Sequence, residues 1–249
     1  MIPESLAAAL AEPSLPWLAT AALAAGVVYG FAGFGAALIF MPVAARVASP
    51  EIAVAAFAVA AIGSAITMLP KTWPACDKRA TVPMIVAASV TMPLGVMALT
   101  RLPETPLRWA ICLLVAATLA AVIAGWKLRL SDAPGPRLAI GATAGLLGGA
   151  TGLLGPVVIL VALSGGDGAA KMRANLATFL TTVTVILLPS LWWQGVLPPP
   201  ILWTGLILTP IYMAGTLLGQ RLFRPGAERL YRATAYAIVA GAVLLGLPV

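Results

Sequence analysis

The chain has 249 residues, of which 61% are hydrophobic and only 9% are charged. Soluble domains do not have this composition, and the apolar runs are long enough to cross a hydrocarbon core, which takes roughly 20 helical residues. These runs are continuous and rich in Ala and Leu, so they favour helices over the alternating strands of a membrane barrel. The net charge of +7 arises from Lys and Arg in short loops, so membrane topology explains it better than nucleic-acid binding does.

The predicted elements follow one another with clear punctuation by Pro, Gly and charged residues. After a short lead at 1–15, apolar runs lie at about 16–47, 52–70, 81–100, 107–126, 138–164, 173–193, 199–220 and 229–248. A linker at 130–137 divides the chain into a first membrane repeat, 16–129, and a second membrane repeat, 138–249. The predicted fold class is therefore an all-α integral membrane protein with four apolar runs in each half.

Two glycine clusters indicate that the halves are repeats. Gly26–Gly33 reads G-x-x-x-G-x-x-G, and Gly145–Gly152 repeats that spacing at the corresponding place in the second half. Gly95–Leu102 and Gly215–Leu222 correspond in the same way. Each glycine costs a helix interior about 1 kcal/mol relative to Ala. One interpretation is close packing of helices through small residues, and the other is a functional break that bends the backbone and bares its amides. The matching positions favour the break.

The basic residues predict how the two glycine-rich runs lie in the membrane. If all eight runs cross, the fifteen Lys and Arg divide six against nine between the two sides. If the runs at 16–47 and 138–164 are instead re-entrant hairpins with glycines at their tips, the division becomes twelve against three, the three being Arg46, Arg101 and Arg108. The other twelve are Lys71, Lys78, Arg79, Lys127, Arg129, Arg137, Lys171, Arg173, Arg221, Arg224, Arg229 and Arg232. The positive-inside rule favours the hairpins, so each half is predicted to hold one hairpin and three transmembrane helices, as inverted repeats with outward-facing termini.

The residue types exclude most enzymatic chemistry. The chain has no histidine, and its eight acids all lie in termini or loops: Glu4, Glu12, Glu51, Asp77, Glu104, Asp132, Asp167 and Glu228. No catalytic base, carboxylate pair or metal-ligand set can be assembled from them, and no G-x-x-x-x-G-K-[ST] motif occurs. We therefore predict a protein that is not an enzyme and that holds no cofactor and no metal. A carrier coupled to protons or cations usually has an intramembrane acid or histidine, which these runs lack.

The glycine breaks do offer a site for an anion. A helix that begins at such a break exposes backbone N–H groups, which attract an anion through partial positive charge, and glycine permits close approach. Hydroxyls on neighbouring runs could complete the coordination, although Ser and Thr often bond back to their own helix and Asn175 could equally be a cap at the interface. The predicted substrate-binding residues are Gly30, Gly33, Phe34, Gly35, Ser64, Gly149, Thr151, Gly152, Gly155, Asn175, Thr178 and Thr182.

These motifs resemble those of the sulfite exporter TauE/SafE family of bacterial membrane permeases. The resemblance rests on the two glycine clusters, on Pro42 and Pro156 after them, and on Gly95 and Gly215 in later helices, and it spans residues 17–247. It implies transport of small sulfur-containing oxyanions or organosulfonates, such as sulfite, sulfoacetate or sulfolactate, across the bacterial inner (cytoplasmic) membrane.

We therefore expect a multi-pass anion permease that exports its substrate. An inside-negative potential favours the outward movement of one negative charge by about 2.3 kcal/mol per 100 mV. Two alternatives stay open: an uptake permease coupled to Na⁺ or H⁺, and the membrane subunit of a multi-component transporter. The expected partners are the small anionic substrate and the lipid bilayer, without nucleic acid, and a homodimer is a possible assembly.

Overall fold

The computed structural model describes residues 3–126, 134–162, 168–222 and 228–247, and within them the chain forms α-helices and no strand. Half of the predicted linker at 130–137 lies outside these residues, and its other half, 134–137, is the start of α9. The helices are α1 (Glu4–Leu10), α2 (Leu15–Ala32), α3 (Ala36–Val47), α4 (Pro50–Ala60), α5 (Ile62–Thr67), α6 (Leu69–Thr72), α7 (Lys78–Arg101), α8 (Glu104–Ile123), α9 (Pro134–Thr151), α10 (Gly155–Ala162), α11 (Ala169–Trp193), α12 (Pro199–Leu222) and α13 (Glu228–Gly246).

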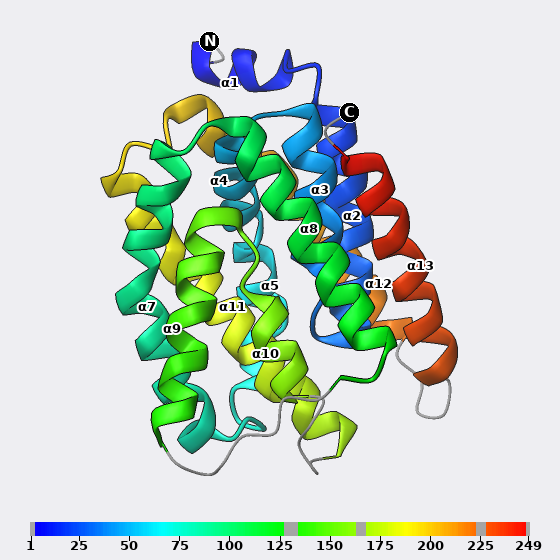
Figure 1. Cartoon of the computed structure of the whole chain (residues 1–249). Helices are drawn as coiled ribbons and strands as arrows, with labels where there is room; N and C mark the ends of the chain where they lie inside the picture. Colours follow the sequence, from blue (N-terminus) through cyan, green and yellow to red (C-terminus); the bar gives the residue numbers. More distant parts are fainter. Residues whose placement is uncertain (1–2, 127–133, 163–167, 223–227, 248–249) are drawn as a thin grey trace.

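The long helices run side by side roughly along one axis, and α1 lies across one end of the bundle (Figure 1). The outer ends of α2 and α3 both lie at the α1 end, whereas the outer ends of α9 and α10 both lie at the opposite end. The last residues of α13 return to the α1 end. The glycine-rich run of each half is thus two helices, and the two pairs approach the middle of the molecule from opposite ends.

Six stretches of the described residues are long and apolar enough to cross a membrane: Leu15–Ala32, Pro50–Thr67, Lys78–Arg101, Glu104–Ile123, Ala170–Trp193 and Pro199–Leu222. The chain is therefore a multi-pass membrane protein. This set differs from the six crossings predicted from charge in two ways. It includes Leu15–Ala32, which was predicted to be part of a hairpin, and it leaves out α13, of which Tyr236–Gly246 is a shorter apolar helix.

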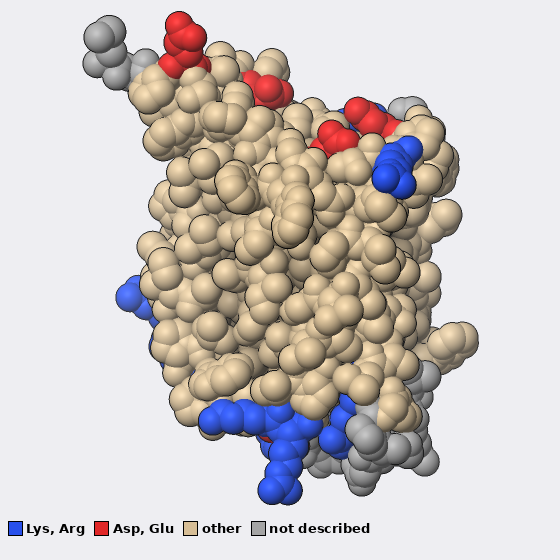
Figure 2. Space-filling view, turned by 90° about the vertical axis from the view of Figure 1, so that its left-hand side faces the viewer, with Lys and Arg blue, Asp and Glu red and all other residues tan. Residues whose placement is uncertain are grey.

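The charged residues divide between the two ends of the bundle. On the face shown in Figure 2, Lys and Arg gather mainly at one end, and Asp and Glu lie at the other. Lys78 begins α7 and Arg221 lies in the last turn of α12, at the end opposite α1, whereas Arg46 and Arg101 lie in the last turns of α3 and α7, at the α1 end. This arrangement agrees with the twelve-against-three division for these residues. Three of the twelve lie outside the described residues: Lys127, Arg129 and Arg224.

Local sequence signals set several helix boundaries. The hydroxyl oxygen of Ser49 accepts a hydrogen bond from the Ile52 amide at 3.2 Å and begins α4. The Asp77 carboxylate accepts bonds from two amides of the first turn of α7. Gly33 ends α2 with a φ of 78°, a left-handed conformation in which a side chain would be strained. These caps explain why the helices start and stop where they do.

At the crossing of α2 and α12, glycines let the two backbones touch. A Cβ atom on Gly26 would lie 2.5 Å from the carbonyl oxygen of Tyr212, and a Cβ atom on Gly30 would overlap the carbonyl oxygen of Thr216. Neither backbone can move away without opening the crossing. These two glycines therefore serve close packing, the small-residue interpretation of the motif.

The second half repeats this device at the crossing of α9 and α7. A Cβ atom on Gly149 would overlap the carbonyl oxygen of Met92, and one on Gly95 would overlap the carbonyl oxygen of Leu146. The Thr91 hydroxyl also donates a hydrogen bond to the Ala142 carbonyl across this crossing, at 2.7 Å. The correspondence of glycines along the sequence thus has a spatial meaning, because the glycine face of each cluster packs on a glycine-containing helix.

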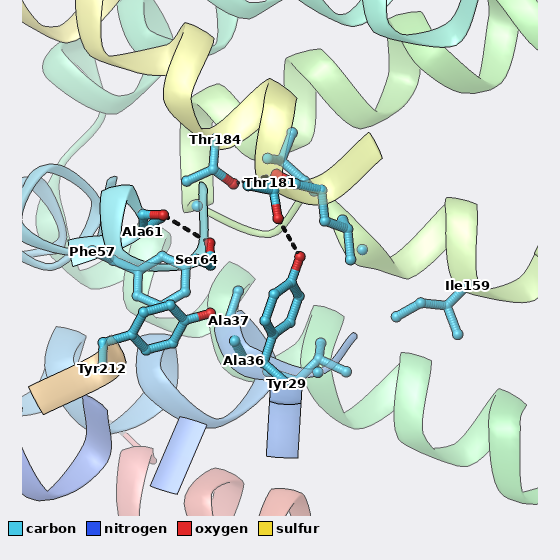
Figure 3. Close-up of a pocket in the computed structure, with 16 residues that line it drawn as sticks. Tyr29, Ala36, Ala37, Phe57, Ala61, Ser64, Ile159, Thr181, Thr184 and Tyr212 are labelled. Atoms are coloured by element: carbon cyan, nitrogen blue, oxygen red, sulfur yellow. Dashed lines mark hydrogen bonds between the residues drawn. The ribbon is translucent and has the colours of Figure 1, made fainter. Parts of the chain in front are cut away.

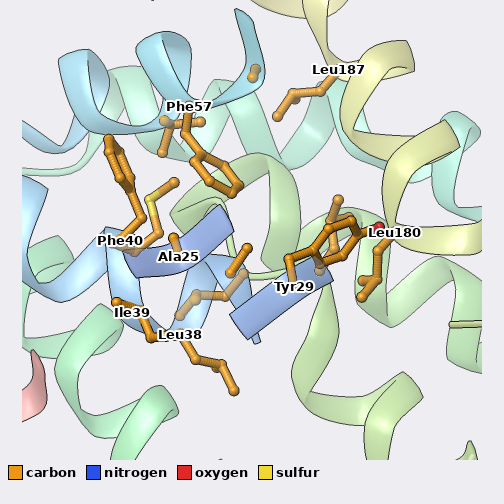
Figure 4. Packing of buried hydrophobic residues seen from close by; sticks show 14 of the residues in the cluster. Ala25, Tyr29, Leu38, Ile39, Phe40, Phe57, Leu180 and Leu187 are labelled. Carbon is orange, nitrogen blue, oxygen red and sulfur yellow. The ribbon is translucent and has the colours of Figure 1, made fainter. Parts of the chain in front are cut away.

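Aromatic side chains join the first glycine-rich segment to the rest of the core (Figure 4). Phe40 on α3 stacks on Phe57 on α4, with ring centroids 5.0 Å apart. Phe57 in turn meets the ring of Tyr212 on α12 edge-on at 5.7 Å, and Tyr212 lies 6.3 Å from Tyr29 on α2. Such ring pairs stabilise a core by about 0.5–1.5 kcal/mol each beyond the area they bury.

The helix crossing predicts a specific effect of adding one methyl group. We expect Gly95→Ala to lower the melting temperature of the purified protein in detergent, because overpacking costs about 1–3 kcal/mol when the neighbour is backbone. Gly241→Ala in α13 is the matched control, since no atom lies within 4 Å of the added Cβ. Equal melting temperatures for the two variants would contradict the packing role of Gly95.

Candidate functional site

A cavity lies where interruptions of three helical segments meet (Figure 3). Its walls come from the α2–α3 break, from the α4–α5 junction at Ala61, from the α9–α10 break, and from the middle of α11 and α12. The cavity volume is about 40 Å³, counted as the space open to the centre of a water-sized sphere. This is enough for a few water molecules or one small polyatomic ion.

The polar side of the cavity consists of hydroxyl groups from four helices. The Tyr29 hydroxyl lies 3.0 Å from the carbonyl oxygen of Ala177, to which it donates, and 2.5 Å from the Thr181 hydroxyl. Ser64 and Thr184 donate back to carbonyl oxygens of their own helical segments, each at 2.7 Å. The three side chains of Tyr29, Ser64 and Thr181 are almost wholly buried. The site therefore offers rotatable O–H groups in a setting that excludes bulk water.

Tyr212 completes this set from α12. Its phenol is buried and points toward Ser64 (Figure 3). The rest of the wall is apolar and includes Phe57, Leu154 and Ile159. No Lys, Arg, Asp or Glu is among the described residues that line the cavity.

The first turn of α3 opens onto the cavity. Gly35 precedes the helix with a φ of 92°, and no side chain caps this helix N-terminus. Gly35, Ala36, Ala37 and Leu38 all line the cavity, and Figure 3 shows Ala36 and Ala37 at its wall. The amides of the first turn have no partner inside the helix, so this end supplies partial positive charge to the cavity.

The second break presents a more closed backbone. Gly152 has a φ of 73° and ends α9, and Gly152, Leu154 and Gly155 line the cavity. The Thr151 hydroxyl accepts a hydrogen bond from the Leu153 amide at 3.3 Å, and Pro156 has no N–H to offer. Fewer amides are therefore open here than at the start of α3.

Arg173 on α11 holds the C-terminal end of α2. Its guanidinium donates a hydrogen bond to the carbonyl oxygen of Gly30, and its side chain packs on Gly33, where an added Cβ would lie 2.6 Å from Arg173 Cγ. A cation is favourable at a helix C-terminus, because the carbonyl groups there carry partial negative charge. Arg173 does not line the cavity, so its role in this geometry is to hold the break against α11.

The structure brings four of the predicted site residues into the cavity wall: Gly35, Ser64, Gly152 and Gly155. Gly30 and Gly149 lie in the helix crossings, and Gly33 faces Arg173. Phe34 lines a separate apolar cavity with residues of α8 and α13. The glycine clusters thus divide into positions that pack and positions that face the cavity.

The other four predicted residues also lie outside the cavity wall. Thr151 caps the second break, and its own hydroxyl donates to the Leu147 carbonyl at 2.7 Å. The Asn175 side-chain oxygen accepts a hydrogen bond from the Asp77 amide at 2.7 Å and so ties α11 to the start of α7. Thr178 and Thr182 have buried hydroxyl oxygens without a hydrogen-bond partner among the described residues.

The sequence reasoning missed four hydroxyl residues of the wall: Tyr29, Thr181, Thr184 and Tyr212. Tyr29 lies inside the first glycine cluster, directly before Gly30, and this position was its only signal. On α11 the spacing of three between Thr181 and Thr184 marks the cavity face, whereas the prediction chose Thr178 and Thr182 on a neighbouring face. Helical spacing alone does not say which of the two faces turns inward.

The described residues contain no group of three or more His, Cys, Asp or Glu side chains that could hold a metal ion. Apolar helices surround an uncharged cavity, with helix breaks at its wall, in a helical membrane protein, and such breaks are a recurrent feature of secondary transporters. The family model described as sulfite exporter TauE/SafE matches residues 18–245, so the chain belongs to this family, as the glycine motifs predicted. No match is found among curated proteins or among solved structures.

The left-handed glycine at the second break gives a testable prediction. Gly152→Ala should destabilise the protein by about 1–2 kcal/mol through its backbone conformation, and further because the new Cβ would lie 2.6 Å from Met41 Cε. Gly125→Ala is the control, since Gly125 has a similar φ of 70° and no atom within 4 Å of an added Cβ. The difference between the destabilisation of the two variants, measured by thermal unfolding, isolates the steric contribution at Gly152.

That steric part should shrink when Met41→Ala is combined with Gly152→Ala, because the two changes share one contact. If Gly152→Ala costs no more than Gly125→Ala, or if Met41→Ala gives no relief, the break is not held by this contact.

Proposed function

We propose that this protein is a permease for small sulfur-containing oxyanions or organosulfonates, and that the anion binds in the cavity between the two glycine breaks. The observation that carries the proposal is the uncapped N-terminus of α3, whose first-turn residues line the cavity. Helix N-termini bind anions through backbone N–H groups and partial positive charge. Membership of the sulfite exporter TauE/SafE family supports sulfur oxyanions as the substrate class.

The proposed ligand sphere combines backbone amides with hydroxyls. The amides of Ala36, Ala37 and Leu38 belong to the uncapped first turn of α3, and these residues line the cavity. Gly35, which precedes them, has no side chain to keep an anion oxygen away from these amides. The hydroxyls of Tyr29 and Thr181 bond to each other across the cavity edge. Because a hydroxyl can rotate, each could exchange its present partner for an anion oxygen. The first break therefore contributes more than the second to this proposed site.

The proposed architecture is a pair of inverted repeats with re-entrant hairpins. In this proposal α2 with α3 enters from the α1 end, and α9 with α10 enters from the other end, so that their tips flank one site near the midplane. The helix directions in Figure 1 and the positions of Arg46, Arg101 and Lys78 support it. Under the positive-inside rule the α1 end then faces outward, and membership of the sulfite exporter TauE/SafE family supports the bacterial inner membrane as the location. A homodimer stays a prediction.

Export follows from the energetics in this proposal. An inside-negative potential favours the outward movement of one negative charge by about 2.3 kcal/mol per 100 mV. The described wall holds no acid that could carry a coupling proton. A singly charged anion could therefore leave the cell without a coupled ion.

A tethered carboxylate tests the amide site. Ala37→Asp places a carboxylate in the first turn of α3, next to the partial positive charge of the helix N-terminus. It should abolish binding of methanesulfonate to the purified protein, measured by calorimetry, because the carboxylate occupies or repels the anion position. Ala37→Asn has the same shape without the charge and should retain measurable binding. Unaltered binding in Ala37→Asp would contradict the site.

Electrogenic efflux tests the direction and the coupling. Liposomes that contain the full chain and are loaded with methanesulfonate should lose it faster when a potassium diffusion potential makes the interior negative. The flux should persist without Na⁺ and without a proton gradient. A fixed stoichiometric requirement for either ion would overturn uncoupled export and favour coupled transport.

A further inference from the structure

The cavity described above is polar without being charged. Its polar groups are the hydroxyls of Tyr29, Ser64, Thr181 and Tyr212 and the first turn of α3, and none of its described wall residues carries a formal charge. The guanidinium of Arg173 on α11 donates to the Gly30 carbonyl at the end of α2 and does not line the cavity.

Such a wall stabilises ions of different charge unequally. The cost of removing an ion from water rises with the square of its charge, whereas its attraction to fixed dipoles rises only in proportion to that charge. The N-terminus of α3 supplies the equivalent of about half a positive charge. Dipoles of this size can offset the burial of one negative charge, but a second charge adds more desolvation cost than attraction.

We propose, resting on the anion-permease function above, that this cavity selects anions with a single negative charge and rejects dianions of similar size. Hydrogen sulfite and alkylsulfonates then belong to the substrate class. Sulfate, fully deprotonated sulfite and the sulfonate–carboxylate dianions sulfoacetate and sulfolactate do not. The apolar residues of the wall, among them Phe57, Leu154 and Ile159, suit the small alkyl group of a sulfonate. The cavity therefore discriminates between anions by their charge, and not by their sulfur chemistry alone.

Calorimetry on the full-length protein in lipid nanodiscs tests this selectivity at constant ionic strength. Methanesulfonate, a monoanion at all relevant pH values, should bind at least about tenfold more tightly than sulfate. The apparent affinity for sulfite should fall when the pH is raised from mildly acidic to mildly alkaline, because hydrogen sulfite is converted to the dianion. The affinity for methanesulfonate should stay constant over the same range, which controls for titration of groups on the protein.

Each outcome decides the inference. Sulfate binding as tight as methanesulfonate binding, or sulfite binding that strengthens with pH, would overturn monoanion selection while leaving the permease function in place. Binding of neither anion would instead refute the proposed function itself. Selective methanesulfonate binding that persists unchanged in Ala37→Asp would put the selective site elsewhere and overturn the assignment to this cavity.

Discussion

A helix that ends inside a membrane leaves backbone N–H and C=O groups without partners, and hydrocarbon supplies none. The architecture of this protein depends on which groups bond to the backbone at each such helix end. The carbonyl end of α2 receives the Arg173 guanidinium, and the Leu153 amide at the second break receives the Thr151 hydroxyl. The amide end of α3 has no side-chain cap and faces the cavity instead. Fold and proposed function meet at this open helix end.

The breaks can hold their positions because the helices beside them are locked by backbone contact. Gly30 presses on α12 and Gly149 presses on α7, at crossings where one added Cβ would overlap a carbonyl oxygen. Tyr29 then ties α2 to α11 through Ala177 and Thr181. A rigid frame around two interrupted helices is what an anion site made of dipoles requires, because dipoles stabilise charge only when they are preorganised.

Much of this could be predicted from the sequence, because it depends on local chemistry. The apolar runs determine the class of protein, and the positive-φ positions at Gly33 and Gly152 fall where the clusters suggested breaks. The predicted residues Thr178 and Thr182 do not line the cavity, whose wall carries Thr181 and Thr184 of the same helix. Successive residues of a helix point about 100° apart, so the inward face depends on what packs around α11, and the sequence of α11 alone does not contain that information.

The sequence by itself determined the membrane class, the family and the places where the two glycine-rich runs are interrupted. Only the tertiary structure decided what each glycine does. Gly26 and Gly35 belong to one cluster with the same local chemistry, yet the first touches the backbone of α12 and the second opens a helix onto a cavity. The reason is physical. The lack of a Cβ permits both close packing and a left-handed turn, and the contacts with neighbouring helices decide which of the two occurs at each glycine.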